Sequence, residues 1–142
     1  MRLMIDTNIF LDVLLRREPF FESSRDVLKL CEDKKVQGFL SASSVTDIFY
    51  IIRKGLQSTE AAYKALGSVL EIVKVLTVTN EDVLNAYIQR AADFEDCLLA
   101  TCARSNKCTA IVTRNKKDFL SFGITLLSPE ELLNEKKNGM IH

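Results

Sequence analysis

The opening segment of the chain, residues 2–10, constrains the fold most strongly. The apolar run Leu3-Met4-Ile5 stops at Asp6, and polar residues then lead into a new apolar period. This pattern predicts a buried strand followed by a helix, with Asp6 at the carboxyl end of the strand. Ligands of open α/β sheets bind just beyond the carboxyl ends of parallel strands, so Asp6 is placed for chemistry as well as for structure.

The rest of the chain alternates between amphipathic helical segments and short apolar runs. After the first strand, we predict further strands at 37–41, 72–78, 110–113 and 124–127. Helices are predicted over 9–14, 22–34, 43–54, 58–70, 80–90 and 93–106, with a short turn or helix at 116–120 and a last helix from 128. Strands separated by helices indicate an α/β fold with right-handed crossovers: a three-layer α/β/α sandwich around a mainly parallel central sheet of four to five strands.

Length and charge limit the domain organisation and the partners. A chain of 142 residues with 47% hydrophobic content fits one domain. We assign residues 1–132 to this domain and 133–142 to a polar C-terminal tail. Basic and acidic residues number 19 each, so any nucleic-acid contact must come from local clusters. No apolar segment reaches the roughly 18 residues of a membrane span and no secretory signal is present, so we expect a cytoplasmic protein without a membrane partner.

The cysteines and the single histidine argue against two kinds of site. The four cysteines include no Cys-x-x-Cys pair, and the only histidine is His142 at the C-terminus. A structural zinc site and a histidine-dependent triad are therefore disfavoured. We expect the cysteines to be reduced and to pack as small hydrophobic residues.

Four acids lie where predicted strands give way to helices: Asp6, Asp47, Asp96 and Asp118. Three of them follow a capping residue by three positions, as Ser44-x-x-Asp47, Asp93-x-x-Asp96 and Asn115-x-x-Asp118. One interpretation is that they are helix capping boxes. Two points weigh against it: Asp is one methylene shorter than the usual Glu or Gln, and Asp47 lies opposite the apolar stripe of its helix.

A parallel sheet would bring these four carboxylates to one edge. Such a cluster repels itself unless a divalent cation binds, and hard oxygen donors suit Mg²⁺ or Mn²⁺. A metal there can lower the pKa of a bound water and stabilise charge on a phosphate. Nearby basic residues are either solvated turn residues or contacts to a phosphodiester backbone. These are Arg16, Arg17, Arg114, Lys116 and Lys117.

In four segments the chain resembles the PIN domain family of Mg²⁺-dependent ribonucleases. The segments are Met4-Ile5-Asp6-Thr7-Asn8, residues 44–50, residues 93–100 and residues 112–119, in the family's order and between Arg2 and about Leu132. The resemblance implies an α/β/α sandwich with a metal cluster on Asp6, Asp47, Asp96 and Asp118. It also implies endonucleolytic hydrolysis of single-stranded RNA by metal-activated water, which leaves a 5′-phosphate and a 3′-hydroxyl.

The resemblance extends to partners. Many small bacterial and archaeal members of the family are VapC-type toxins, which dimerise and are held inactive by a cognate antitoxin. It therefore implies an RNA substrate, a protein antitoxin and a homodimer. The main alternative function is a PIN-like module that binds RNA or protein without cutting. A phosphoacceptor switch domain is a third possibility, but Asp47 lies inside a predicted helix, which counts against it.

The chain departs from the family pattern at two positions. Asp47 stands where Glu is common, and its shorter arm favours an outer, water-mediated role. Asn115 stands where many members carry Asp, and it can supply a neutral oxygen or cap a helix. We expect Asp93 to cap first and to bind metal second. We interpret Asn8 and Thr113 as orienting residues.

Overall fold

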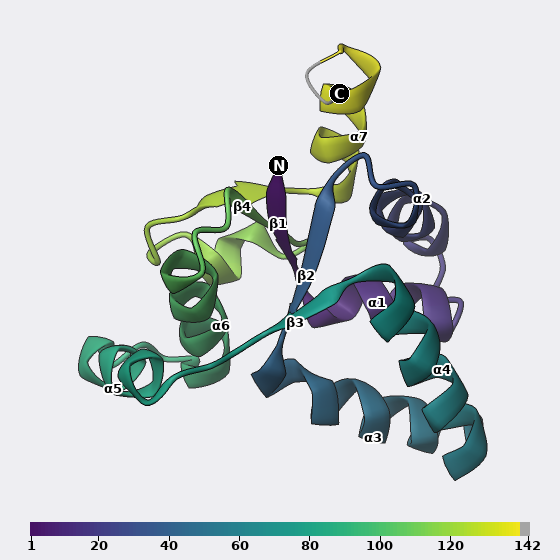
Figure 1. Ribbon diagram of the computed structural model, residues 1–142, viewed down its shortest axis with the longest axis horizontal. Coiled ribbons are helices and arrows are strands. Elements are labelled where there is room, and N and C mark those ends of the chain that lie inside the picture. Colours follow the sequence, from purple (N-terminus) through teal and green to yellow (C-terminus); the bar gives the residue numbers. More distant parts are fainter. Residues whose placement is uncertain (140–142) are drawn as a thin grey trace.

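The computed structural model describes residues 1–139 and contains a five-stranded parallel sheet with the order β3-β2-β1-β4-β5 (Figure 1). Its strands are β1 (Arg2–Ile5), β2 (Gln37–Ser41), β3 (Lys74–Leu76), β4 (Ala110–Val112) and β5 (Thr125–Leu127). The α-helices are α1 (Thr7–Leu14), α2 (Phe21–Glu32), α3 (Val45–Leu56), α4 (Thr59–Ile72), α5 (Asn80–Gln89), α6 (Phe94–Ser105) and α7 (Pro129–Lys137). Two 3-10 turns, η1 (Ala42–Ser44) and η2 (Lys116–Phe119), follow β2 and β4.

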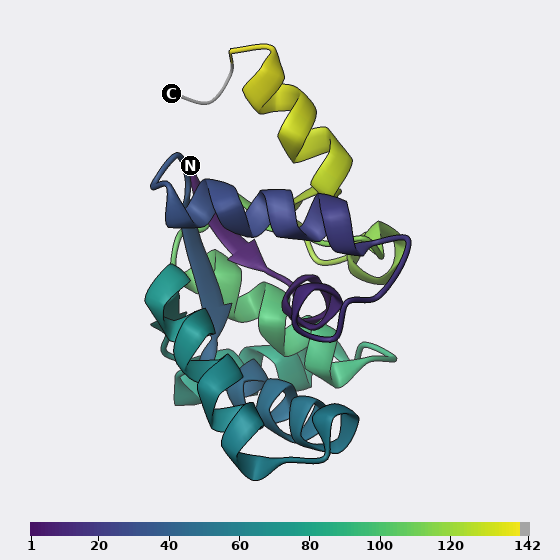
Figure 2. The same cartoon turned by 90° about the vertical axis from the view of Figure 1, so that its right-hand side faces the viewer.

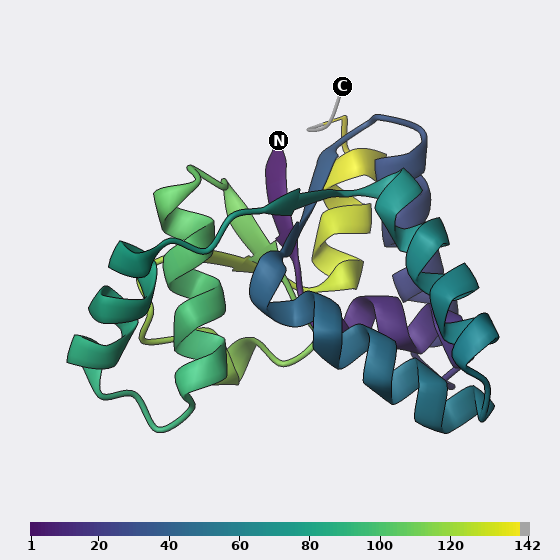
Figure 3. The same cartoon turned by 60° about the horizontal axis from the view of Figure 1, so that its bottom comes forward.

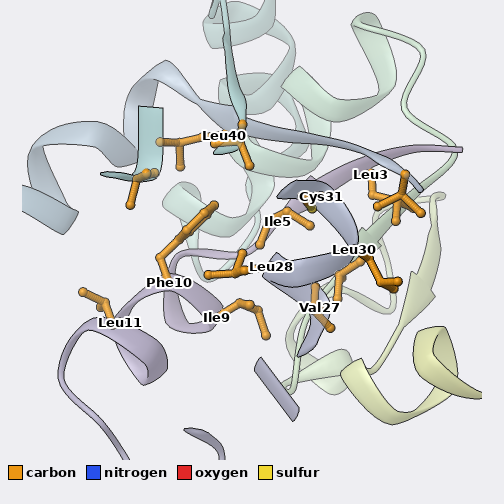
Figure 4. Close-up of a cluster of buried hydrophobic side chains, with 14 of the residues drawn as sticks. Leu3, Ile5, Ile9, Phe10, Leu11, Val27, Leu28, Leu30, Cys31 and Leu40 are labelled. Atoms are coloured by element: carbon orange, nitrogen blue, oxygen red, sulfur yellow. The ribbon is translucent and has the colours of Figure 1, made fainter. Parts of the chain in front are cut away.

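Successive side chains of the strands point to opposite faces of the sheet, and each face is covered by helices. Leu3 and Ile5 belong to a core formed with α1, α2, α3, α4 and α7 (Figure 4). Met4, between them, belongs to a second core with α5 and α6. On the first face, α2 packs against both α1 and α7 (Figure 2). The predicted three-layer α/β/α sandwich is confirmed.

Burial on both faces explains why the central strands are uniformly apolar. Leu3, Met4 and Ile5 are fully buried, as are all three residues of β4. A strand covered on both faces by helices has no solvent side, so it lacks the polar alternation of an edge strand. This is why the opening apolar run predicts the centre of the sheet.

The carboxyl ends of β2, β1 and β4 lie next to one another. The backbone N–H of Asp6 donates to the carbonyl of Val112 at 3.0 Å, and that of Thr113 donates to Leu127 at 2.9 Å. Helices α1 and α3 begin close to this edge (Figure 3). Because α6 leads into β4 and returns along the sheet, its N-terminus lies at the same edge. The fold thus collects strand ends and helix starts at one site.

Most predicted boundaries differ from the structure by one or two residues, and two of the differences concern β3 and the C-terminal tail. The third strand covers only Lys74–Leu76 of the predicted 72–78, because Ile72 still belongs to α4. Helix α7 continues to Lys137, so the predicted tail at 133–142 begins inside a helix, and its residues 140–142 lie outside the described part. None of the helices in residues 1–139 has the length and apolar character needed to span a membrane.

Candidate metal centre

A pocket of about 430 Å³ opens at the carboxyl edge of the sheet, and all four predicted acids line it. Asp6 follows β1, Asp47 and Asp96 lie in the first turns of α3 and α6, and Asp118 lies in η2. Four separate elements therefore each contribute one carboxylate. The pocket is also lined by the apolar side chains of Leu11, Ile51, Leu99 and Phe119.

Of the three predicted capping residues, Ser44, Asp93 and Asn115, one caps a helix through its side chain. Asp93 caps α6, because its Oδ1 accepts the backbone N–H of Asp96 at 2.9 Å. The side chains of Ser44 and Asn115 make no capping bond at the starts of α3 and η2. Asp93 therefore has the helix-start role that was expected to come first.

The argument from side-chain length is wrong. Reciprocal capping boxes start α5 and α7, and the first of them uses Asp. The carboxylate of Asp82 accepts the backbone N–H of Thr79 at 3.1 Å, and the Thr79 hydroxyl accepts the backbone N–H of Asp82 at 3.1 Å. An Asp at the third helical position can thus close a box. What separates Asp47, Asp96 and Asp118 from Asp82 is that they line the pocket.

Asp6 is held by the loop that follows β4. The Thr113 hydroxyl, which is fully buried, donates to Asp6 Oδ2 at 2.8 Å and accepts the backbone N–H of Asn115 at 3.0 Å. Burial raises the pKa of Asp6, while the bond from Thr113, a backbone bond from Thr7 and the charge of Arg114 act in the opposite direction. Thr113 therefore orients Asp6 and favours its charged form.

The carboxylates of the pocket raise one another's pKa values. Burial, followed by the charges of Asp93, Asp6 and Asp118, raises the pKa of Asp96 to about 7. The pKa of Glu95, which also lines the pocket, rises to about 7, first through a hydrogen bond with Asp47 and then through burial. Because these carboxylates repel one another, they cannot all be ionised without a cost in free energy. A bound divalent cation would remove this repulsion.

The donor set fits a hard divalent cation that keeps part of its water shell. Every candidate donor is an oxygen, and the amides of Asn8 and Asn115 also line the pocket. Within residues 1–139, no three His, Cys, Asp or Glu side chains stand close enough together to hold an ion as placed. Mg²⁺ suits such a site, because it is bound through one or two carboxylates and retains several waters.

Two of the five basic residues predicted to bind phosphate, Arg114 and Lys116, already form ion pairs with acidic side chains. The guanidinium of Arg114 donates to both oxygens of Asp12, at 3.0 and 3.1 Å. Lys116 Nζ lies 2.6 Å from Glu131 Oε1 and lowers the pKa of that carboxyl. The Lys116 pair is solvent-exposed and therefore contributes little to stability, whereas the Arg114 pair is mostly buried.

The other three cations lie on or near the surface. Arg17 Nη1 donates to Asn8 Oδ1 at 3.3 Å, which connects it to a pocket-lining residue. Arg16 is exposed and its guanidinium lies over the Phe21 ring, 5.4 Å from the centroid. Lys117 is exposed in η2.

Asp12 is a residue of this region that the sequence interpretation did not single out. Its side chain has no exposed surface, although it carries a carboxylate. The signal was an acid inside the apolar run of α1, between Leu11 and Val13. An acid at a core position implies a buried basic partner, but the sequence does not say which one.

The parallel α/β/α sandwich and its acidic pocket place the protein among the α/β domains with a candidate metal centre at the carboxyl edge of the sheet. The family model described as PIN domain matches residues 2–117. The chain therefore belongs to the PIN domain family, whose members are typically nucleases.

Several solved structures share this fold, among them VapBC and VapC proteins. VapBC2 from Rickettsia felis, bound to a DNA fragment from its promoter, is 19% identical with a TM-score of 0.70, and the match covers 90% of this chain and 98% of that one. VapC20 from Mycobacterium tuberculosis, described as a toxin that cleaves the sarcin-ricin loop, is 16% identical with a TM-score of 0.65 and coverages of 87% and 96%. VapBC-1 from Haemophilus influenzae is 20% identical with a TM-score of 0.67 and coverages of 92% and 99%. A search of curated proteins found no match.

Proposed function

We propose that the protein is a Mg²⁺- or Mn²⁺-dependent endoribonuclease that hydrolyses phosphodiester bonds of single-stranded RNA. The observation that carries this proposal is the pocket in which Asp6, Asp47, Asp96 and Asp118 meet from four elements. Their mutual effect on pKa, together with an all-oxygen donor set, supports a divalent cation there. Membership of the PIN domain family supports the nuclease chemistry.

Asp6, Asp96 and Asp118 are the proposed ligands, and Asp47 is proposed to act through a metal-bound water because its arm is short. When bound, the metal would supply an activated water and stabilise the charge that develops on the phosphate. Thr113 orients Asp6 through the bond at 2.8 Å. Asn8 and Asn115 supply neutral donors beside the carboxylates, and Asp93 holds the start of α6.

Substrate RNA would be held by cations near the pocket. Arg16, Arg17, Lys116 and Lys117 lie in the two segments that follow α1 and β4, and contacts to phosphate place a strand without reading its sequence. Their number is small, which agrees with a net charge of zero. We assign Arg114 to the ion pair with Asp12 and not primarily to RNA binding, because the pair already uses the two-pronged donor face of its guanidinium.

The solved structures of the same fold support a biological setting for this activity. VapBC complexes and a toxin described as cleaving the sarcin-ricin loop share the fold at 16–20% identity. We propose that this protein is the toxin of a toxin–antitoxin pair, with a protein antitoxin as partner and a homodimer as its working form. Copurification of a small protein encoded by the neighbouring gene would support this setting, and an unrelated neighbour would contradict it.

Cleavage of end-labelled single-stranded RNA with Mn²⁺ tests the activity. We expect the wild type to cut, and EDTA, Asp6→Asn and Asp96→Asn each to reduce the rate at least a hundredfold. Asp26→Asn is the matched control, because Asp26 is a surface acid of α2 paired with Arg25 outside the pocket. Wild-type protein that binds RNA but does not cut it under any metal would instead support a non-catalytic binding module. The Asp at position 47 and the spread of the carboxylates favour that second function.

A further inference from the structure

A buried ion pair connects α1 to the loop that carries part of the pocket. Asp12 lies on α1 with none of its side chain exposed, and Arg114 lies between Thr113 and Asn115. Arg114 Nε donates to Asp12 Oδ2 at 3.0 Å and Nη2 donates to Oδ1 at 3.1 Å. This two-pronged arrangement fixes the direction of the guanidinium as well as its distance, which a lysine would not do.

The surroundings of the pair restrict it further. Ser24 Oγ of α2 donates to Asp12 Oδ2 at 3.0 Å and is itself fully buried. The Phe20 ring covers the guanidinium of Arg114, with its centroid 4.0 Å from Cζ. Both charges are therefore hydrogen-bonded and largely shielded from water. Stability alone is a weak explanation for such a pair, because well-packed apolar residues often replace buried pairs without loss of stability.

The same two chain segments are joined a second time inside the pocket. Thr113, the neighbour of Arg114, donates to Asp6, which precedes the first residue of α1. The loop then continues through Asn115, whose carbonyl accepts the N–H of Asp118 at 3.0 Å. The adjacent residues Thr113 and Arg114 thus each bind the α1 segment over a long sequence distance, directly before the loop turns into η2.

We propose that Asp12 and Arg114 are positioning residues for the metal centre. Their pair holds the loop at 113–118 against α1, and so sets the distance and direction of Asp118 relative to Asp6. The proposal rests on the proposed function for the identity of the bound ion and on the contacts above for the positioning. Neither residue touches the ion or the RNA.

The test uses the full chain with Asp12→Leu combined with Arg114→Met, which replaces the pair by apolar side chains of similar shape. We expect a melting temperature at or above that of the wild type. In EDTA, the amides of Asn115 and Asp118 should exchange hydrogen at least fivefold faster. Calorimetric titration with Mn²⁺ should show affinity about tenfold weaker, the lower end for losing an outer partner of a metal ligand.

Two further variants keep the experiment decisive. Arg114→Lys keeps the positive charge but loses the two-pronged hydrogen bond to Asp12, and it replaces the double variant if that variant does not fold. We expect the same changes in hydrogen exchange and Mn²⁺ affinity, but smaller ones. Val69→Ala removes core packing in α4 without touching the pocket, and should leave Mn²⁺ affinity unchanged.

The proposal would be overturned if the double variant or Arg114→Lys bound Mn²⁺ as tightly as the wild type does. It would also be overturned if Val69→Ala lost as much Mn²⁺ affinity as the double variant. Wild-type protein that binds no Mn²⁺ would contradict the proposed function itself. In that case, hydrogen exchange in EDTA still tests whether the ion pair positions the loop. Unchanged exchange at Asn115 and Asp118 in the double variant would overturn the positioning role.

Discussion

Thr113→Val is the substitution for which the structure gives the clearest magnitude. Valine keeps the shape of threonine but removes a buried hydroxyl that donates to Asp6 and accepts from Asn115. A hydrogen bond to a charged acceptor contributes about 1.5–3 kcal/mol and a neutral one about 1 kcal/mol. We therefore expect the free energy of unfolding to fall by about 3 kcal/mol at pH 8. For a chain of this size, that lowers the melting temperature by roughly 6–12 °C.

The loss should depend on pH, and its sign follows from the pKa of Asp6. Burial raises that pKa above its ordinary value of 3.8, so the native state keeps a proton that the unfolded chain has released. Stability from this group is therefore lost as pH rises from about 4 through the native pKa. Removing the Thr113 bond, which lowers the pKa, raises it further. The difference between variant and wild type should therefore be smaller at pH 4, where mainly the bond from Asn115 is lost, and larger at pH 8.

Urea unfolding followed by circular dichroism, in EDTA at pH 4 and pH 8, measures both effects. Thr113→Ser is the matched control, because it keeps the hydroxyl and loses one buried methyl, at a cost of about 1 kcal/mol at both pH values. If Thr113→Val and Thr113→Ser unfold at the same urea concentration at pH 8, the hydroxyl does not hold Asp6 and the reasoning is refuted.

Three further predictions follow from the same contacts. In EDTA the melting temperature should fall as pH rises from 5 to 8, because the native pKa of Asp96 is about 7 and its unfolded value is lower; Asp96→Asn should flatten this slope, and an unchanged slope would contradict the assignment. Mn²⁺ at a fixed concentration, a hundred times its dissociation constant at pH 8, should stabilise the fold by about 2.7 kcal/mol at pH 8 and by less at pH 5, as measured by thermal melts; equal shifts would argue against binding by these carboxylates. Gly38→Ala should destabilise by about 1–3 kcal/mol in urea unfolding, since its Cβ would lie 2.6 Å from Cys31 Sγ, and Cys31→Ala should restore part of the loss; no rescue would place the strain elsewhere.

The architecture was predictable because the central strands are covered on both faces. The continuous apolar runs at 3–5 and 110–112, bounded by polar residues, favour buried strands, and the amphipathic segments between them favour parallel crossovers. Strand β3 was harder to delimit, because it lies at the edge of the sheet and α4 runs apolar into it through Ile72. Side-chain pattern does not mark where an apolar helix ends and an apolar strand begins.

The sequence predicts the lining of the pocket only at the level of the acids. Strand ends of a parallel sheet meet at one edge, so Asp6, Asp96 and Asp118 could be expected to share a pocket. The partner of Arg114 was not predictable, because Asp12 is 102 positions away and no local spacing connects them. From the sequence alone, a basic residue in this turn therefore predicts a phosphate contact. Side-chain length does not decide which residue closes a capping box, since the Asp82 carboxylate reaches the backbone N–H of Thr79 at 3.1 Å.

Anomalous scattering from crystals soaked in Mn²⁺ tests the central claim most directly, namely that carboxylates from four elements bind one divalent ion. The account predicts an anomalous peak inside the pocket, with Asp6 and Asp96 carboxylate oxygens at about 2.0–2.3 Å and Asp118 bound directly or through water. A peak at another part of the surface, or no peak in the pocket at a Mn²⁺ concentration that saturates the protein in solution, would contradict it.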